Sequence, residues 1–525
     1  MLKSNKMKKN LKLFICLLVI LALAGFFRLW QLNSIPPGLY PDEAINGNEA
    51  LTSPGKIFYH ENNGREGLYI NLISLSFSIF GTSIFSFRLV SAIIGILTVL
   101  GLYLLTKELF AQYNEGKSCY IALLSSFFLA ISFWHTNFSR IGFRAILLPF
   151  ILVFSFYFLF KGFREKKILN FIISGILFGL GFYTYTSYRF IVLLLPLILF
   201  CWWLIYKKQN LQKKFLLFTS YLLLFTLILA LPIGIYFLKN PQDFIGRAAP
   251  ISIFAAENPI KEFGKSLILH LGMFNFRGDS NWRHNFSGAP ELFWPVGILF
   301  LIGIIFSIKE FIFSLRNKSC SLFIVHCSLI SWFFIMLLPG ILTYEGIPHA
   351  LRTIGVIPVV YIFAGFGGWK IYQWFDKNTK RKRLVFTAIF LFLLMTGVVE
   401  FDKYFNKWGR HPEVRNAFSA DYVEIGNYLN SLPTETQKYV IVNELGVPLY
   451  GISIPAQTPI FIETTKFGQP RSTYLAAENL DQIRIDHKKT VIIPIYDGKL
   501  LNELQEKFPQ GLIKEKNGLN IYEIE

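Results

Sequence analysis

Charged residues are scarce in this sequence. Asp, Glu, Lys and Arg account for 16% of the 525 residues, whereas 53% of the residues are hydrophobic. A soluble domain normally carries about a quarter charged residues, which keep its surface hydrated. The deficit excludes a soluble globular protein and, together with 55 Phe, indicates an integral membrane protein.

Cysteine is scarce as well. The chain has five cysteines, all in or beside apolar stretches: Cys16, Cys119, Cys201, Cys320 and Cys327. We therefore expect no disulfide framework in the polar loops. The sequence also lacks C-x-x-C and H-E-x-x-H patterns, so it predicts no metal site. A divalent cation held by His284, His349 and acidic loop residues stays open, because spacing alone does not decide it.

Long apolar runs are abundant. Runs of about 17 to 25 residues can cross the hydrocarbon core as helices. We expect about 11 spans, at residues 11–30, 83–106, 119–135, 145–160, 168–185, 190–206, 215–238, 291–308, 319–338, 353–369 and 384–400. The shorter apolar stretch 67–80 is followed by Gly81 and is expected to lie at the interface or to re-enter the membrane. The predicted fold class is therefore a polytopic α-helical membrane protein.

The net charge of +19 is concentrated in short loops. Lysines and arginines gather before residue 13 and in the segments 161–167, 207–214 and 370–383. Short basic loops mark the cytoplasmic side of a membrane protein. We therefore predict a multi-pass protein of the cytoplasmic membrane with a cytoplasmic N-terminus, an exterior C-terminus and no nucleic-acid partner.

The first apolar run has a second interpretation. Lysines followed by an apolar core and "ALAG" resemble a cleaved signal peptide. Trp30 suits an interfacial position and favours an uncleaved anchor. Cleavage would leave the later topology unchanged.

The loops on the opposite side hold most of the acidic and aromatic residues outside the spans. We expect them at 31–66, 135–144, 239–290 and 339–352, and the first contains Asp42 and Glu43 in "YPDEA". Taken singly, an Arg at a helix end contacts lipid headgroups and a loop carboxylate is merely solvated. Their joint placement on the exterior side, where positive charge is normally depleted, instead indicates a functional site.

The residue types at this face predict a chemistry. Arginine binds phosphate through a planar fork of donors and stays charged, and a nearby carboxylate can deprotonate a hydroxyl. Together with apolar grooves for a lipid chain, they predict transfer of a group from a lipid phosphate to an acceptor. The candidates for phosphate or sugar contact are Arg140, Arg144, Arg189, His349 and Arg352, and those for acceptor or sugar contact are Glu66, Asp279 and His284.

Several motifs resemble those of a known family, the GT-C membrane glycosyltransferases, in the branch of protein O-mannosyltransferases and aminoarabinose transferases (glycosyltransferase family 39-like). They are "YPDEA", "GREGLYINLISLSFSIFGTSIFSFRLVSAIIGILTVLGLYLLTKELF", "FSRIGFRAILLPF", "GDSNWRHNFSGAPEL" and "IPHALRTIG". The resemblance covers roughly residues 10 to 400. The Asp-Glu pair alone is a weak signal, but the set in this order is fairly specific.

The resemblance implies a reaction and roles. Family members use polyprenyl-phosphate sugars and invert the anomeric centre. By this likeness Asp42 would be the general base, Glu43 would orient the site beside it, and Arg65 would lie near the donor phosphate. The implied partners are membrane lipid, a polyprenyl-phosphate sugar and an acceptor glycan, lipid or protein, as in protein glycosylation or cell-envelope assembly.

The last 125 residues differ in kind. "KYVIVNE" and "KKTVIIPIYD" predict strands, whereas "ADYVEIGNYLNSLP" and "DGKLLNELQEKFP" predict helices that end at proline. The Asn-Gly of "KEKNGLNIYEI" predicts a hairpin. We therefore expect a transmembrane domain over 1–400 and a small exterior α/β domain over 401–525.

Two other functions remain open. A lipid-linked glycan polymerase or ligase would use a pyrophosphate-linked donor. A lipid or solute transporter would more often place charges at the middle of the bilayer, and the spans here hold few. Release of polyprenyl phosphate, of polyprenyl pyrophosphate or of neither separates the three functions.

Overall fold

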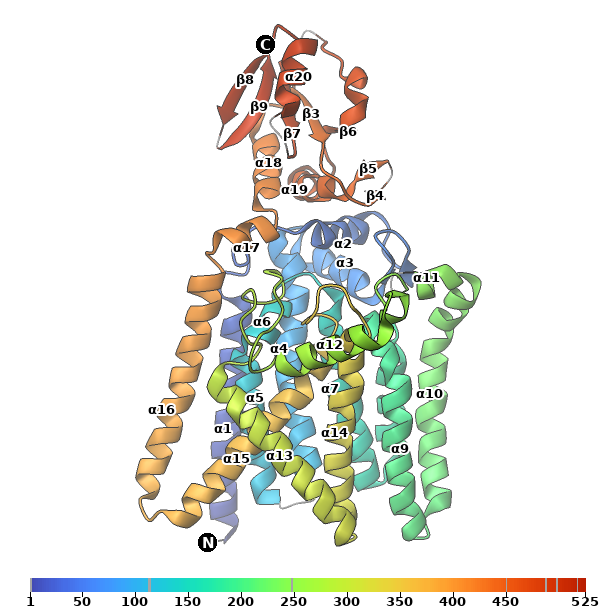
Figure 1. Ribbon diagram of the computed structural model, residues 1–525, viewed down its shortest axis with the longest axis vertical. Helices are drawn as coiled ribbons and strands as arrows, with labels where there is room; N and C mark the ends of the chain where they lie inside the picture. Colours follow the sequence, from blue (N-terminus) through green and yellow to red (C-terminus); the bar gives the residue numbers. More distant parts are fainter. Residues whose placement is uncertain are drawn as a thin grey trace. The chain divides into compact units, whose positions relative to one another are not determined.

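The computed structural model describes residues 2–111, 115–246, 249–449, 451–486, 489–496, 499–516 and 518–525, with the backbone alone for 2–9 and 115–116. The chain divides into two compact units (Figure 1). The first comprises the chain up to Leu32, residues 66–69 and residues 91–408, and the second comprises 33–65, 70–90 and 409–525. The loop after the first helix thus belongs with the C-terminal residues, a grouping that the predicted boundary at residue 400 did not include.

The first unit is a bundle of apolar helices. Its main helices are α1 (Leu2–Leu29), α5 (Glu115–Ile131), α7 (Leu147–Glu165), α8 (Ile168–Gly181), α9 (Ile191–Lys208), α10 (Gln212–Lys239), α12 (Pro259–Gly272), α13 (Trp294–Arg316), α14 (Cys320–Ile341), α15 (Ile357–Asn378) and α16 (Lys382–Phe401), with most of α4 (Ile84–Ala111). The short helices α6 (Phe133–Phe138) and α11 (Pro241–Ile245) lie in connections, and a π-helical turn, Asp402–Trp408, follows α16.

The prediction of a multi-pass membrane protein is confirmed. Within the described residues, nine helices are long and apolar enough to cross a membrane. Two predicted spans, 119–135 and 168–185, fall instead on the shorter apolar helices α5, of 17 residues, and α8, of 14 residues. All five cysteines are free thiols in the structure.

Small residues let neighbouring helices of the bundle approach closely. A Cβ atom on Gly303 of α13 would lie 1.9 Å from the carbonyl oxygen of Phe363 in α15. A Cβ atom on Gly367 of α15 would lie 2.0 Å from the carbonyl oxygen of Leu299 in α13. Close backbone contact through small residues is a usual source of helix association in membranes.

The second unit contains the predicted α/β fold. Five strands are ordered β6-β3-β7-β9-β8. β3 (Gln437–Val442) runs parallel to β6 (Thr473–Ala476) and β7 (Thr490–Pro494), whereas β9 (Leu519–Ile524) runs antiparallel to β7 and to β8 (Leu512–Lys516). The helices of this part are α17 (Pro412–Ala417), α18 (Ala420–Ser431), α19 (Gln457–Phe467) and α20 (Lys499–Lys507), and β4 (Pro448–Leu449) pairs with β5 (Ile452–Ser453).

The predicted strands and helices of this part are present. The sheet has apolar side chains on both faces, with Val440 in one cluster and Ile441 in the other. The proposed turn residue Asn517 and the expected helix start at 497–498 lie outside the described residues.

The segment "PPGLYP" leads into α2 (Pro41–Thr52). Pro41 occupies the first helical position, where its missing N–H costs nothing. Gly38 has φ +79°, and a Cβ atom there would lie 2.4 Å from the Phe418 carbonyl oxygen. α2 packs on α19, where Asn48 donates to the Gln457 carbonyl at 3.0 Å. This packing explains why residues 33–65 and 409–525 form one unit.

The segment between α2 and α4 contains two short strands and one short helix. β1 (Phe58–Tyr59) pairs with β2 (Arg65–Glu66), and α3 (Leu68–Phe80) has 13 residues. The expected interfacial or re-entrant stretch 67–80 is thus a helix, and its position relative to the bilayer stays a prediction.

Candidate functional site

The two carboxylates of "YPDEA" have different surroundings within the second unit. Both lie in the first turn of α2, where negative charge opposes the positive end of the helix dipole. Glu43 is 0% exposed; its Oε2 accepts from the Tyr40 N–H at 3.2 Å, and its Oε1 lies 3.6 Å from the Arg88 Nε. Glu43 therefore holds the start of the helix and neutralises a buried guanidinium.

Asp42 is half-buried rather than buried. Among the described residues its hydrogen-bond partner is Asn62, whose Nδ2 donates to Oδ1 at 2.7 Å. One amide donor fixes the orientation of the carboxylate and does not neutralise its charge. Of the two carboxylates, Asp42 is therefore the more accessible, and Glu43 supports the start of the helix.

The guanidinium of Arg65 forms hydrogen bonds with side chains of α2. It is 2% exposed and donates through Nη1 to Asn46 Oδ1 and through Nη2 to Glu49 Oε1, both at 2.7 Å. Burial raises the pKa of Glu49, and the charge of Arg65 opposes that rise. These contacts tie β2 to α2, so the geometry favours a structural role, and donor-phosphate contact by Arg65 stays a prediction.

Two arginines share one carboxylate in the first unit. Glu66 is 2% exposed and accepts from the Arg144 Nε at 2.7 Å, and its Oε1 lies 4.0 Å from the Arg189 Nη2. Arg144 also lies over the ring of Tyr185 at 5.5 Å. Two positive charges against one negative charge leave an excess of one, and the Arg189 side chain is 22% exposed. The cluster can therefore attract an anion such as a phosphate.

A third group of polar side chains brings together the predicted exterior loops 239–290 and 339–352. Asp279 is 2% exposed, and its Oδ2 contacts the His284 Nδ1 at 2.9 Å and accepts the Ala350 N–H at 2.8 Å. The His349 Nδ1 lies 3.8 Å from the same oxygen, and the two imidazole rings are 4.8 Å apart between centroids. The predicted residues Asp279, His284 and His349 therefore do come together.

This triad has the composition of a cation site. The ligand atoms of Asp279, His284 and His349 all lie within 4.8 Å of one another. Imidazole nitrogens with a carboxylate oxygen suit Zn²⁺ and similar divalent ions. The residues fit such an ion, although the Asp279–His284 contact also makes an ordinary hydrogen bond.

Two buried groups support the triad. Glu291 accepts the Asp279 N–H at 3.0 Å, and burial together with the Asp279 charge raises its pKa well above the usual range. The Nδ1–H of His270 donates to the Ser266 carbonyl at 2.8 Å, and its Nε2 accepts the His349 N–H at 3.2 Å. Burial lowers the pKa of His270 to about 4, so it is neutral and able to accept.

The remaining predicted arginines are held by backbone oxygens. Arg140 is 0% exposed and donates to the carbonyls of Phe27, Trp30 and Gln31 at the end of α1. Arg352 is half-buried and donates to Thr343 Oγ1 at 2.9 Å and to the Glu345 carbonyl at 2.7 Å. The geometry favours a structural role for Arg140, and Arg352 lies beside the triad.

Sequence reasoning overlooked the supporting residues Arg88, His270 and Glu291 and assigned no role to Glu49. For Arg88 a signal was present, because an ionisable residue inside the apolar run "IFSFRLVSAII" is unusual and normally has a partner. No comparable signal marks His270 or Glu291, whose partners lie in other loops.

The chain was compared with known proteins. A family model described as dolichyl-phosphate-mannose-protein mannosyltransferase matches residues 68–236. The sequence matches no curated protein. The matches to solved structures cover more of the chain than the family model does. ArnT from Cupriavidus metallidurans bound to undecaprenyl phosphate has a TM-score of 0.57 at 11% identity, covering 96% of this chain and 97% of that chain.

Two further structures are similar. ArnT from the same organism in the apo state has a TM-score of 0.53 at 10% identity, with 97% of each chain covered. The oligosaccharyltransferase AglB from Archaeoglobus fulgidus, in complex with an inhibitory peptide and a dolichol-phosphate, has a TM-score of 0.49 at 14% identity, covering 92% of this chain and 70% of that chain. The fold likeness rests on the two ArnT structures and extends over nearly the whole chain.

Proposed function

We propose, from the GT-C membrane glycosyltransferase fold of this chain, that it transfers a sugar from a polyprenyl-phosphate donor to a hydroxyl acceptor. Two comparisons support a lipid-phosphate donor, since one ArnT structure holds undecaprenyl phosphate and the family model is described by a dolichyl-phosphate sugar. The acceptor is a glycan, a lipid or a protein on the exterior face of the membrane.

One observation carries the proposal: Asp42 is half-buried with an amide partner, while the adjacent Glu43 is buried against Arg88. A general base must be ionised and within reach of its substrate. Asp42 meets the second condition, and Glu43, at 0% exposure, does not. We therefore assign the base to Asp42 and a positioning role to Glu43.

The reaction then runs as a single displacement with inversion. The acceptor oxygen attacks the anomeric carbon and passes its proton to Asp42 as the bond from that carbon to the phosphate oxygen breaks. The leaving polyprenyl phosphate takes the bonding electron pair and gains negative charge. Within the first unit, the Arg144, Arg189 and Glu66 cluster, with its excess positive charge, is proposed as a separate point of contact for a phosphate group.

The triad of Asp279, His284 and His349, together with Arg352, is proposed to contact the sugar or the acceptor. A divalent cation held by the triad would supply further positive charge for an anionic group. The residues that position the triad, His270 and Glu291, would act through it.

Donor turnover tests this function. Purified protein in detergent would be given polyprenyl-phosphate sugars or polyprenyl-pyrophosphate glycans, and the lipid products would be identified by mass spectrometry. Release of polyprenyl phosphate that depends on a hydroxyl acceptor is the expected result. Release of polyprenyl pyrophosphate instead would assign the chain to the polymerase or ligase class, and release of neither would contradict both.

A further inference from the structure

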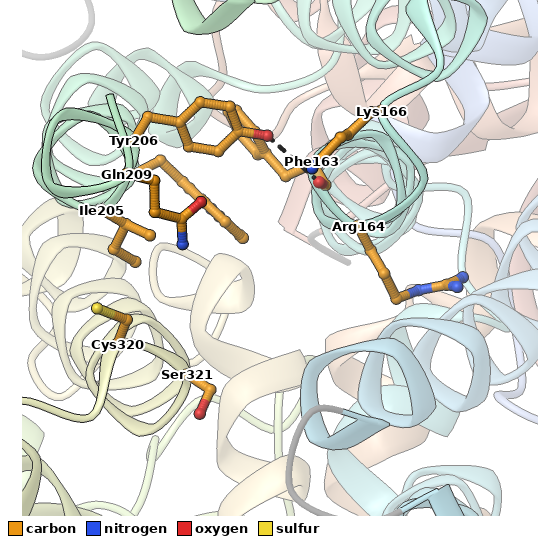
Figure 2. Close-up of a pocket in the computed structure, with 9 residues that line it drawn as sticks. Phe163, Arg164, Lys166, Ile205, Tyr206, Gln209, Cys320 and Ser321 are labelled. Carbon is orange, nitrogen blue, oxygen red and sulfur yellow. Dashed lines mark hydrogen bonds between the residues drawn. The ribbon is translucent and has the colours of Figure 1, made fainter. Parts of the chain in front are cut away.

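A cavity of about 380 Å³ lies where α7 and α9 end and α14 begins (Figure 2). Its volume falls within the roughly 300–1,000 Å³ of small-molecule sites. Arg144 precedes the first turn of α7, whereas the cavity adjoins the last turn of that helix. At 1.5 Å per residue, Arg144 and the cavity are therefore about 30 Å apart along the axis of α7. The cavity therefore lies at the other end of the bundle from the Arg144 cluster and needs an explanation of its own.

The polar groups that line this cavity include several hydrogen-bond donors. Lys166 offers an ammonium group, Gln209 an amide and Ser321 a hydroxyl. Among the described residues that line the cavity, none is acidic. Arg164 also lines it, but the Arg164 Nη2 lies 3.0 Å from Glu108 Oε2, so its charge is compensated. A lining of this kind favours a ligand with acceptor oxygens and negative charge.

Trp202 adds a buried donor. It lines the cavity and is 6% exposed, and its Nε1–H has no hydrogen-bond partner among the described residues. Its ring stacks on Phe163 with the centroids 4.3 Å apart, which fixes the indole in place. A buried N–H without an acceptor is costly. A ligand oxygen in the cavity would remove that cost.

The depth of the cavity identifies the source of the ligand. Trp202 and Tyr206 belong to the last two turns of α9, which ends with Lys207 and Lys208. Aromatic rings followed by lysines mark the headgroup level of a membrane, on the side rich in positive charge. Phe200 and Leu204 of the same helix are 53% and 40% exposed, and their spacing from Trp202 places them on the opposite face of α9, so this helix has one face towards the cavity and another open to the bilayer.

We propose that this cavity binds the phosphate headgroup of an anionic membrane phospholipid. Lys166, Gln209 and the Trp202 N–H donate to the phosphate oxygens, and the acyl chains extend from the headgroup into the bilayer. The bound lipid is a resident of the bundle and is distinct from the sugar donor.

The test measures lipid retention by the full-length protein. Delipidated protein in detergent would be mixed with phosphatidylglycerol or phosphatidylcholine and analysed by native mass spectrometry. Wild type should retain one phosphatidylglycerol in preference to phosphatidylcholine. Lys166→Gln should lower that retention roughly tenfold and Trp202→Phe roughly fivefold, which are the sizes expected for one charged and one neutral hydrogen bond.

A matched control separates the site from general surface charge. Lys208→Gln removes the same charge from an exposed position on α9 that does not line the cavity, and it should change retention less than about twofold. Trp202→Phe keeps the ring stack and serves as the second variant if Lys166→Gln folds poorly. Equal retention in all three variants, equal binding of phosphatidylcholine, or displacement of the lipid by excess inorganic phosphate would each overturn the proposal.

Discussion

Asp42 and Glu43 are adjacent in the chain, and their surroundings predict opposite consequences of removing the charge. Asp42→Asn keeps an acceptor for the Asn62 amide but cannot take a proton. Because general-base catalysis typically contributes about 10²- to 10⁴-fold, we expect turnover to fall by about that factor while donor binding and yield stay normal. Single-turnover kinetics with a lipid-linked sugar would measure the loss.

Glu43→Gln is the matched control at the neighbouring position. It weakens a buried ion pair with Arg88 and the hydrogen bond from the Tyr40 N–H. The expected cost is about 1–3 kcal/mol of unfolding free energy, visible as a lower melting temperature, with a much smaller loss of turnover per folded molecule than in Asp42→Asn. Wild-type turnover in Asp42→Asn beside an inactive but folded Glu43→Gln would transfer the role of base to Glu43.

The arginines allow a second prediction. Arg189→Lys keeps one positive charge at the Glu66 cluster but loses the planar fork that binds two phosphate oxygens. We expect the KM for the lipid donor to rise roughly tenfold, the size of one charge-assisted hydrogen bond, with an unchanged melting temperature. Arg316→Lys, at an exposed position at the end of α13, should change neither quantity.

Arg65→Lys should behave differently from Arg189→Lys. A lysine cannot reach both Asn46 and Glu49 in the geometry of the fork, so the second unit loses stability. A lower melting temperature with an unchanged donor KM is expected. A tenfold higher donor KM in Arg65→Lys at unchanged stability would instead restore Arg65 to the donor phosphate, as the family resemblance implies.

The arginines also show where sequence reasoning stops. Arg140 and Arg144 are four residues apart in "RIGFR", and both were predicted to contact phosphate or sugar. Arg140 is directed at the carbonyls that end α1, whereas Arg144 meets the carboxylate of Glu66. Their partners come from segments at least 78 residues away, so the local sequence does not distinguish a carbonyl-bound guanidinium from one beside a substrate.

At the scale of elements, the pairing of α13 with α15 depends on glycines at the crossing. Gly303→Ala would place a methyl group 1.9 Å from the Phe363 carbonyl oxygen. Overpacking of this kind costs about 1–3 kcal/mol, so we expect thermal unfolding in detergent to shift down by several degrees. Gly234→Ala in α10 is the control, because a Cβ atom there meets nothing within 4 Å and alanine favours the helix.

The elements themselves were largely predictable, because apolar length and periodicity determine where helices form in a membrane. Every predicted span coincides with an apolar helix, and the strands "KYVIVNE" and "KKTVIIPIYD" are β3 and β7. The lengths of α5 and α8 were overestimated, since hydropathy continues past Ile131 into the separate short helix α6 and past Gly181 into turns. The pairing of α2 with α19 depends on contacts over about 400 residues, such as Asn48 with Gln457, and no local pattern predicts it.

At the scale of the whole molecule, the second unit constrains the topology. It is built from residues 33–65, 70–90 and 409–525, and its first and last segments are held together by direct contacts such as the hydrogen bond from Thr458 to the Leu39 carbonyl at 2.9 Å. Both segments must therefore lie on the same side of the membrane. The chain between them must cross an even number of times.

The nine long helices satisfy this condition, because eight of them follow α1. With α3 at the interface, as predicted, the shorter helices α5 and α8 keep the parity even only if both cross or neither does. The basic segments 161–167 and 207–214 lie one on each side of the pair α8 and α9, and the positive-inside rule places both in the cytoplasm. Since α9 crosses, α8 must cross as well, and α5 must then do the same.

The last prediction follows from that parity and from the lysines at the start of the chain. With the N-terminus in the cytoplasm, residues 33–65 and 409–525 are both exterior. An alkaline phosphatase fusion after residue 525 should be active and a fluorescent-protein fusion there dark. Single cysteines at Asn63 and Leu445, both exposed, should react with an impermeant maleimide in intact cells, whereas one at exposed Lys208 should react only after lysis. Labelling of Asn63 and Leu445 from opposite sides would contradict the second unit, and labelling of both only after lysis would reverse the orientation and remove Asp42 from the exterior face.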